Sequence, residues 1–161
     1  MNVDKPEVPV LRTRVEMTQL VLPEHTNAMG TIFGGQVAAW IDICAAISAQ
    51  RFCRRQCVTI AIDSLEFLHP IQRGHIAIFQ ACVNAAWGKS MEIGVRVEGE
   101  DPMTGDRTHT ASAYCTFVAL DANGRPTIVP KLLCGTEDEL RRRAEAEIRR
   151  GDRLRRANRA P

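Results

Sequence analysis

Residues 36–51 read QVAAWIDICAAISAQR, and this stretch decides the fold. It places alanine and larger apolar residues on every face of a helix and contains neither glycine nor proline, so it predicts a helix about 24 Å long. A helix that is apolar nearly all round cannot keep one face in water. We therefore expect it to lie at the centre of the domain, surrounded by other elements.

The residues after this helix change to the two-residue period of β-strands. The first run shifts its apolar phase near Ser64, which predicts a bulge. Connectors this short join antiparallel strands, because a parallel crossover needs a dozen or more residues, so we expect hairpins between consecutive strands. A strand before the helix is predicted over residues 13–22, ended by Pro23. The later runs cover residues 58–67, 76–85, 91–97 and 108–120.

These elements indicate one α+β domain. The chain has 161 residues, of which 45% are hydrophobic and 25% are charged. This length and composition are ordinary for a single globular domain. The economical fold is an antiparallel sheet wrapped around the long central helix. We expect a flexible arm over residues 1–12, the domain over residues 13–133, and a separate charged helix and tail over residues 136–161.

The tail carries its own helix signals. Thr136 and Glu139 have the spacing of a capping box, and acidic residues precede arginines by four positions, which favours a solvated helix. We expect this helix to dock lightly by a narrow apolar stripe and to fray beyond Gly151. Removal of everything after Gly135 is expected to change the function of the domain by no more than a few fold. The stripe consists of Leu140, Ala144 and Ile148.

The charge distribution argues against nucleic-acid binding. The net charge is +2, and residues 136–161 hold nine arginines against six acidic residues, which leaves 12 basic and 13 acidic side chains in residues 1–135. Such a body lacks the basic footprint of a nucleic-acid-binding domain. No apolar run approaches the ~20 residues of a membrane span, and the N-terminus lacks the pattern of a secretory signal. We expect a cytoplasmic protein without nucleic-acid or membrane partners.

Six cysteines are scattered through the chain, and without an export signal they are expected to be free thiols. Cys53 and Cys57 form a CxxxC pair. No second cysteine or histidine pair at zinc-ligand spacing accompanies them, so packing as small apolar residues is favoured over a metal site. We expect neither a disulfide nor a bound metal.

Asp42 is the first candidate for chemistry, because it lies in the middle of the apolar helix between Ile41 and Ile43. A carboxylate in such surroundings must be paired or must face a cleft. A structural ion pair or a cap on a neighbouring loop is one explanation. A catalytic or ligand-facing acid is the favoured one.

Gly34 and Gly35 come directly before the helix. Backbone N–H groups at a helix N-terminus, unshielded by Cβ atoms, can bind an oxyanion, although close helix–sheet packing explains a glycine pair at least as often. Asp42 follows Gly35 by seven residues, about two turns, so the two lie on nearly the same helix face and could share one groove.

Asn27 lies in a loop of small and polar residues, where a turn role is the ordinary expectation.

The sequence lacks the motifs of several other enzyme classes. No histidine adjoins a nucleophile in a known local signature, and neither the dinucleotide-binding nor the P-loop glycine pattern occurs. Triad hydrolysis, nicotinamide chemistry and nucleoside-triphosphate chemistry are therefore unsupported.

The segment HTNAMGTIFGGQVAAWID, residues 25–42, resembles the motif of the hotdog-fold acyl-CoA thioesterases, in particular short bacterial broad-range acyl-CoA hydrolases and the cytosolic long-chain hydrolases of animals. The likeness continues through VTIAIDSLEFLHPIQRG, WGKSMEIGVRVEGED and TASAYCTFVALDANGRP, and covers roughly residues 15–131. It implies a hotdog fold, in agreement with the periodicity of the chain.

By this resemblance, the family's helix acid falls on Asp42, its loop amide on Asn27 and its helix-start glycines on Gly34 and Gly35. Sites in the family form between two protomers, so the acid of one chain would meet the glycine amides of the other. This site between two chains differs from the groove suggested above, in which Gly35 and Asp42 belong to one helix. The resemblance implies a homodimer as the active unit, often assembled further into a trimer of dimers.

Three further positions are similar to substrate contacts of the family. Lys89 and Ser90 match the place where relatives touch coenzyme A, although a polar turn before a strand explains them about as well. Thr59, in the strand after the helix, resembles a position that lines the acyl pocket.

The activity that the resemblance implies is hydrolysis of an acyl-CoA thioester to a free acid and coenzyme A, with no metal or redox cofactor. Asp42 would serve as general base on water or as nucleophile, Gly35 as oxyanion donor and Asn27 as an orienting group. A hydratase of the same fold is disfavoured, because that chemistry usually relies on a helix-borne His or Glu. A non-catalytic acyl-CoA-binding protein is disfavoured by the acid at position 42.

Overall fold

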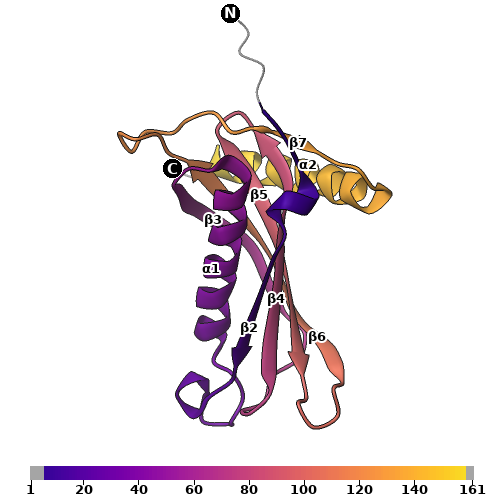
Figure 1. Ribbon diagram of the computed structural model, residues 1–161. Helices are drawn as coiled ribbons and strands as arrows, with labels where there is room; N and C mark the ends of the chain where they lie inside the picture. Colours follow the sequence, from indigo (N-terminus) through magenta and orange to yellow (C-terminus); the bar gives the residue numbers. More distant parts are fainter. Residues whose placement is uncertain (1–5, 159–161) are drawn as a thin grey trace, which may run out of the picture.

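The computed structural model describes residues 6–158. A five-stranded antiparallel sheet curls around helix α1 (Gly34–Cys53), as Figure 1 shows. This is the hotdog architecture, so the predicted α+β fold class is confirmed. The strands follow the order β2 (Val15–Leu20), β4 (Ile76–Trp87), β5 (Ser90–Glu100), β6 (Arg107–Ala119) and β3 (Cys57–Phe67) across the sheet.

Helix α1 is longer than the predicted stretch by two residues at each end. It begins after Phe33 and ends at Arg54, whose φ of 52° is left-handed. The side facing the sheet is buried, with Ile41 fully inaccessible. Ile43 on the other side is 50% exposed. The sheet thus covers one side of the helix, not all of it as the sequence predicted.

Strand β3 lies at the edge of the sheet and pairs with β6. The hairpin expected between residues 58–67 and 76–85 is therefore wrong. Eight connecting residues, at about 3.3 Å each, easily cross three strand spacings of about 4.8 Å. The bulge expected near Ser64 is confirmed, and a second register shift lies between Thr59 and Ala61.

The N-terminal residues are more ordered than the loose arm expected over residues 1–12. Strand β1 (Glu7–Pro9) pairs in parallel with β7 (Lys131–Leu133), and a 3-10 helix, η1 (Val10–Thr13), follows it. Val10 is only 2% exposed, and its burial ties the segment to the domain. Residues 1–5 lie outside the described residues.

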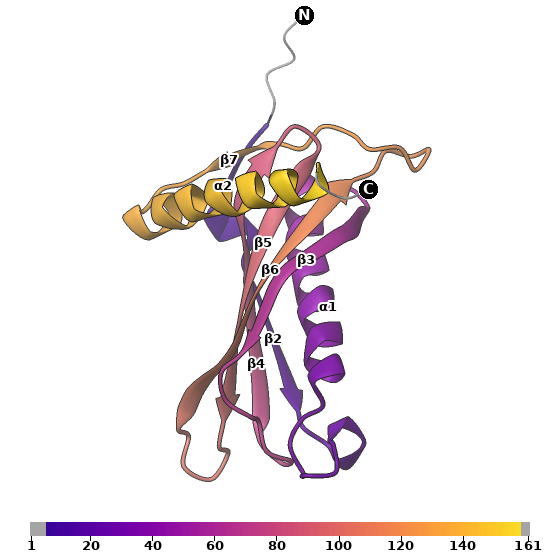
Figure 2. The same ribbon diagram turned by 180° about the vertical axis from the view of Figure 1, so that it is seen from behind.

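Helix α2 (Glu137–Ala157) crosses the face of the sheet opposite to α1, which is clear in Figure 2. Thr136 Oγ1 accepts a hydrogen bond from the Glu139 amide at 3.2 Å. The Glu139 carboxylate accepts from the Gly135 amide at 2.7 Å, not from that of Thr136. The helix continues past Gly151, where fraying was expected, and residues 159–161 lie outside the described part of the chain.

The stripe that was expected to dock α2 is exposed instead, so that prediction is wrong. Leu140 and Ile148 are 53% and 66% exposed, and Ala144 is exposed as well. The helix docks through its arginines. The arginine side chains neutralise acidic side chains that are buried on the sheet. An apolar stripe could not do this.

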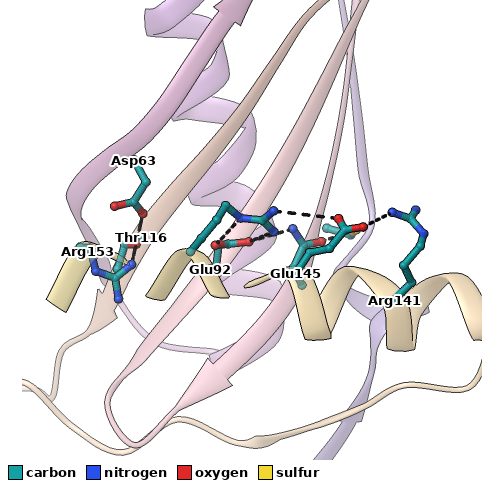
Figure 3. A network of polar contacts seen from close by, with 9 residues as sticks. Asp63, Glu92, Thr116, Arg141, Glu145 and Arg153 are labelled. Carbon is teal, nitrogen blue, oxygen red and sulfur yellow. Dashed lines mark hydrogen bonds and ion pairs between the residues drawn. The ribbon is translucent and has the colours of Figure 1, made fainter. Parts of the chain in front are cut away.

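Two ion pairs join α2 to the sheet, within the network drawn in Figure 3. Arg149 donates two hydrogen bonds, of 2.8 and 3.1 Å, to Glu92, whose side chain is fully buried on β5. Its guanidinium also stacks 3.6 Å from the Tyr114 ring centroid. Arg153 lies 3.2 Å from Asp63, which is 5% exposed. These contacts make α2 an integral part of the domain and contradict the expectation that it docks lightly.

Neither helix within residues 6–158 combines the length and hydropathy that a bilayer crossing requires.

Arg149→Ala should lower the free energy of unfolding by about 3 kcal/mol, because it leaves the buried Glu92 carboxylate without its cation. Urea denaturation followed by tryptophan fluorescence measures this. Arg155→Ala is the matched control, because Arg155 pairs with Asp152 on the surface of the same helix, and it should cost no more than about 0.5 kcal/mol. Equal effects of the two variants would contradict the role given to Arg149.

Candidate active site

Asp42 and Thr59 are the two predicted site residues that a single protomer brings together. Asp42 lies on α1 between the inaccessible Ile41 and the half-exposed Ile43, at the border of the covered face. Thr59 lies on the edge strand β3, and its hydroxyl donates a 2.6 Å hydrogen bond to Asp42 Oδ1. The contact holds the carboxylate toward β3. Oδ1 of Asp42 therefore has a hydrogen-bond donor. Because Asp42 lies at the border of the buried face, its carboxylate is accessible from outside the core.

The thiol of Cys115 does not compete with Asp42 as a nucleophile. Burial, and next the charge of Asp42, raises the pKa of Cys115 to about 12. The thiol therefore stays protonated near neutral pH, and a protonated thiol is a poor nucleophile. Asp42 therefore stays the candidate reactive group at this place.

The first turn of α1 presents free backbone donors. The amides of Gln36 and Val37 both donate to the Phe33 carbonyl, at 2.9 and 3.2 Å. The amides of Gly34 and Gly35 have no acceptor among residues 6–158, as the start of a helix permits. Oriented amides at a helix N-terminus attract a negatively charged oxygen.

Glycine at position 35 also has a packing reason. A Cβ atom there would clash with the ring of Phe33, and one at Gly34 would touch the Phe67 ring at 3.4 Å. The close packing expected at the glycine pair is therefore present, and the oxyanion role of the two amides stays a prediction. The close packing leaves the amides uncovered by side chains of their own residues.

Asn27 organises the loop that leads into α1. Its Oδ1 accepts from the Met29 amide at 2.9 Å, and its Nδ2 donates to Thr31 Oγ1 at 2.9 Å. The Phe33 amide in turn donates to the His25 carbonyl at 2.8 Å. The asparagine is thus held beside the start of the helix, and no hydrogen bond among the described residues joins it to Asp42.

An apolar cavity of about 310 Å³ opens beside Gly34. Nothing in the sequence pattern marked it, because its walls come from three separate segments of the chain. They are residues 32–37 at the start of α1, residues 67–71 after β3 and residues 110–111 on β6. Phe67 and Leu68 are about half exposed at this place.

Lys89 and Ser90 lie far from these groups in one protomer. They occupy the turn between β4 and β5, at the end of the molecule where α1 finishes (Figure 1). Helix α1, with 20 residues, is about 30 Å long, so its first turn lies at the opposite end. Ser90 donates to the Trp87 carbonyl at 3.4 Å, and Lys89 is exposed.

The distance along α1 separates the acid from the amides. Asp42 follows Gly35 by seven positions, which is about 10 Å of helix. A reacting carbonyl must lie about 3 Å from both the attacking group and the oxyanion donor. A groove along one helix, which the bare sequence suggested, therefore cannot present both groups to one thioester.

Within residues 6–158, no three His, Cys, Asp or Glu side chains converge as a metal site would need.

Comparisons with known proteins bear directly on this site. The thioesterase superfamily profile matches residues 29–105. The acyl-CoA thioester hydrolase YkhA of Bacillus subtilis (strain 168), itself uncharacterized, is 42% identical over 128 residues, which cover 80% of this chain and 74% of that protein. The profile match includes α1 and β3, which carry Asp42 and Thr59.

Solved structures agree with the sequence match. The crystal structure of an apo-hexameric acyl-CoA thioesterase superposes with a TM-score of 0.92 at 39% identity, covering 96% of this chain and 99% of that one. The acyl-CoA hydrolase of Staphylococcus aureus, solved with butyryl coenzyme A, coenzyme A and coenzyme A disulfide, gives 0.89 at 34% identity, with 94% and 93% covered. That hydrolase has also been solved with an aspartate, an asparagine or a threonine replaced by alanine.

With this fold and these relatives, the chain belongs to the acyl-CoA thioester hydrolases of the thioesterase superfamily.

Asn27→Ala should loosen the loop that leads into α1, because it removes the side-chain hydrogen bonds to Met29 and Thr31. Amide hydrogen exchange of those two residues should quicken about fivefold, the effect of losing a bond worth about 1 kcal/mol. Asn123→Ala, in the exposed turn before Gly124, is the control and should leave the loop unchanged. Unchanged exchange in Asn27→Ala would show that the loop does not depend on this side chain.

Proposed function

We propose that the chain hydrolyses acyl-CoA thioesters to a free carboxylic acid and coenzyme A, with Asp42 as the reactive carboxylate. The observation that carries the proposal is the 2.6 Å hydrogen bond from Thr59 to Asp42, at the border of the buried face of α1. The three residues replaced in the Staphylococcus aureus hydrolase are of the same types as Asp42, Asn27 and Thr59. Each stands one position later in that chain, so the spacing among them is identical.

Asp42 performs the step in one of two ways. As general base it takes a proton from water while the water oxygen attacks the thioester carbon. As nucleophile it attacks the carbon itself and forms an anhydride, which water then cleaves. In both routes the C–S bond breaks, the thiolate of coenzyme A leaves, and Thr59 keeps the carboxylate aimed at the carbonyl.

The oxyanion donor comes from a second copy of the chain. About 10 Å of helix separates the acid from the amides of the same protomer, and the amide of Gly35 of the partner subunit would supply the missing group. Asn27 stands beside that helix start and would orient water or the thioester. A site shared in this way needs a dimer that sets two α1 helices antiparallel.

Strand β3 offers the surface for this dimer. It is an edge strand with free backbone groups on one side, and such an edge pairs readily with another strand. Its Val58, Ile60 and Ile62 are between 41% and 59% exposed, and Ile43 of α1 is 50% exposed nearby. A two-fold axis at this edge joins the two sheets and covers the open side of α1. Three such dimers would make a hexamer.

The same two-fold arrangement brings opposite ends of two protomers together. The turn at Lys89 and Ser90 of one chain would then approach the first turn of α1 in its partner, where those two residues can contact the coenzyme A portion. The apolar cavity beside Gly34 is suited to the acyl chain, because its walls are mostly aliphatic and aromatic.

The proposal requires neither metal nor redox cofactor, because water, a carboxylate and backbone amides suffice for thioester hydrolysis. It includes no nucleic-acid or membrane partner. A location in the cytoplasm, where thiols are generally kept reduced, agrees with the six free cysteines.

The direct test is release of free thiol from a series running from acetyl-CoA to stearoyl-CoA, with the thiol measured by a chromogenic disulfide. Turnover of at least one member supports the proposal. Tight binding of the whole series without release would instead identify a non-catalytic acyl-CoA-binding protein. Formation of a hydroxyacyl-CoA from an enoyl-CoA would identify a hydratase.

Asp42→Asn should lower kcat by about 100-fold or more, because it keeps the shape of the side chain and removes the basic oxygen. Steady-state hydrolysis measures the loss, and circular dichroism checks the fold. Asp106→Asn is the control, because Asp106 lies in the exposed β5–β6 turn and should not change kcat. Wild-type turnover by Asp42→Asn would disprove the role of this acid.

The purified protein should have a mass well above the 17.9 kDa of one chain at micromolar concentration, measured by light scattering. Ile60→Lys places a charge on the exposed edge strand and should split the assembly and abolish turnover together. Met103→Lys, at an 89% exposed position in the β5–β6 turn, should change neither. An active monomer would contradict the shared site.

A further inference from the structure

We propose that Cys53 and Cys57 form a dithiol site that a hydroperoxide closes to an intrachain disulfide. Cys53 is the last residue of α1, and Cys57 is the first of β3. Their sulfur atoms lie 3.1 Å apart in the reduced protein. A disulfide bond is about 2.0 Å long, so an approach of about 1 Å joins them. Only the turn Arg54–Gln56 lies between the two residues.

Local structure holds both sulfur atoms in place. Arg54 adopts the left-handed conformation that ends the helix, and its amide donates to the Gln50 carbonyl at 2.8 Å. The chain therefore reverses directly after Cys53. The Cys53 thiol contacts the Ala49 carbonyl at 3.1 Å, which keeps its side chain beside the start of β3. The proximity is thus built into the helix end and the turn.

Ionisation is favoured at Cys53, so the proposed oxidation begins there. The hydrogen bond from the Cys57 thiol, with a contribution from Arg55, lowers the pKa of Cys53 to about 7 despite its burial. A large fraction is therefore thiolate at neutral pH, and thiolate is the form that attacks peroxides. Burial raises the pKa of the four cysteines outside the pair. These are Cys44, Cys82, Cys115 and Cys134.

The reaction balances in two steps. The Cys53 thiolate attacks one oxygen of the hydroperoxide, which breaks the O–O bond and gives a sulfenic acid and hydroxide, or an alkoxide from an organic peroxide. The Cys57 sulfur then attacks the sulfenic sulfur, the S–O bond breaks, and water leaves with the proton of the Cys57 thiol. Two thiols are oxidised, and one peroxide is reduced.

A small oxidant can approach the pair from the side of Cys57, because Cys53 itself is only 6% exposed. Residues Arg54–Gln56 are exposed, and Cys57 is half-buried at the end of the edge strand. The bridge would join the C-terminal end of α1 to β3, the two elements that carry Asp42 and Thr59. Oxidation therefore acts on the junction between the two halves of the candidate site and leaves the site residues themselves unmodified.

The test treats the full-length oligomer with a small molar excess of hydrogen peroxide at pH 7.5 and measures the intact mass under denaturing conditions. Loss of the mass of two hydrogen atoms per chain, restored by dithiothreitol, is expected. Trypsin cuts after Arg51, Arg54 and Arg55, so the Cys53 and Cys57 peptides separate unless a disulfide links them. Recovery of FCR joined to the peptide of residues 56–73 identifies the bridge.

Two variants distinguish this site from general thiol oxidation. Cys57→Ser should stop at the sulfenic acid, trapped by dimedone on Cys53, and Cys134→Ser should form the bridge as the wild type does. If Cys57→Ser fails to fold, tryptic peptide mapping of the oxidised wild-type protein still shows whether the Cys53–Cys57 disulfide forms. An unchanged mass, a bridge between other cysteines, or sulfinic acid on Cys53 without a bridge would overturn the proposal and leave the pair as packing residues.

Discussion

The sheet covers helix α1 on one side only, and the other features of the molecule depend on that constraint. Ile41 is inaccessible against the sheet, whereas Ile43, two positions on, is half exposed. Asp42 falls between them, so its carboxylate is partly desolvated but still reachable by a substrate. The same incomplete cover leaves the edge of β3 open beside the helix. The same incomplete packing therefore exposes both the candidate acid and a surface that a second protomer can cover.

The rise per residue of an α-helix determines whether the acid and the oxyanion donor of the proposed site can come from one protomer. An acid and an oxyanion donor two turns apart point to the same side of α1 but stand about 10 Å from each other. Antiparallel pairing of two α1 helices removes this difficulty, because the start of one helix comes beside the middle of the other. The Thr59–Asp42 hydrogen bond belongs to one protomer and is complete without the partner. In the proposed site, the carboxylate is thus oriented within one protomer, and the second protomer would add the oxyanion donor.

The sequence was most informative where local periodicity determined structure. The apolar stretch around Asp42 predicted α1, and alternation predicted the strands and the bulge near Ser64. Periodicity could not predict which strand pairs with β3. The connector between β3 and β4 is long enough for a hairpin and also for a crossing of the curled sheet. Val10 looked like part of a loose arm, since the strand that orders the segment lies more than 120 residues away. The cavity beside Gly34 was missed for the same reason.

The docking face of α2 shows where periodicity misleads. The exposed stripe of the helix was apolar enough to suggest an interface, yet two acids of the sheet determine how the helix lies. Glu92 and Asp63 point away from α1 and are almost fully buried beneath α2. A buried carboxylate is costly without a cation, and the sheet strands supply none at these positions among the described contacts. Arg149 and Arg153 provide the two cations from one helix, four residues apart on one face. The register and orientation of α2 therefore follow from charge neutralisation, and the apolar stripe is turned outward because the arginines face the sheet.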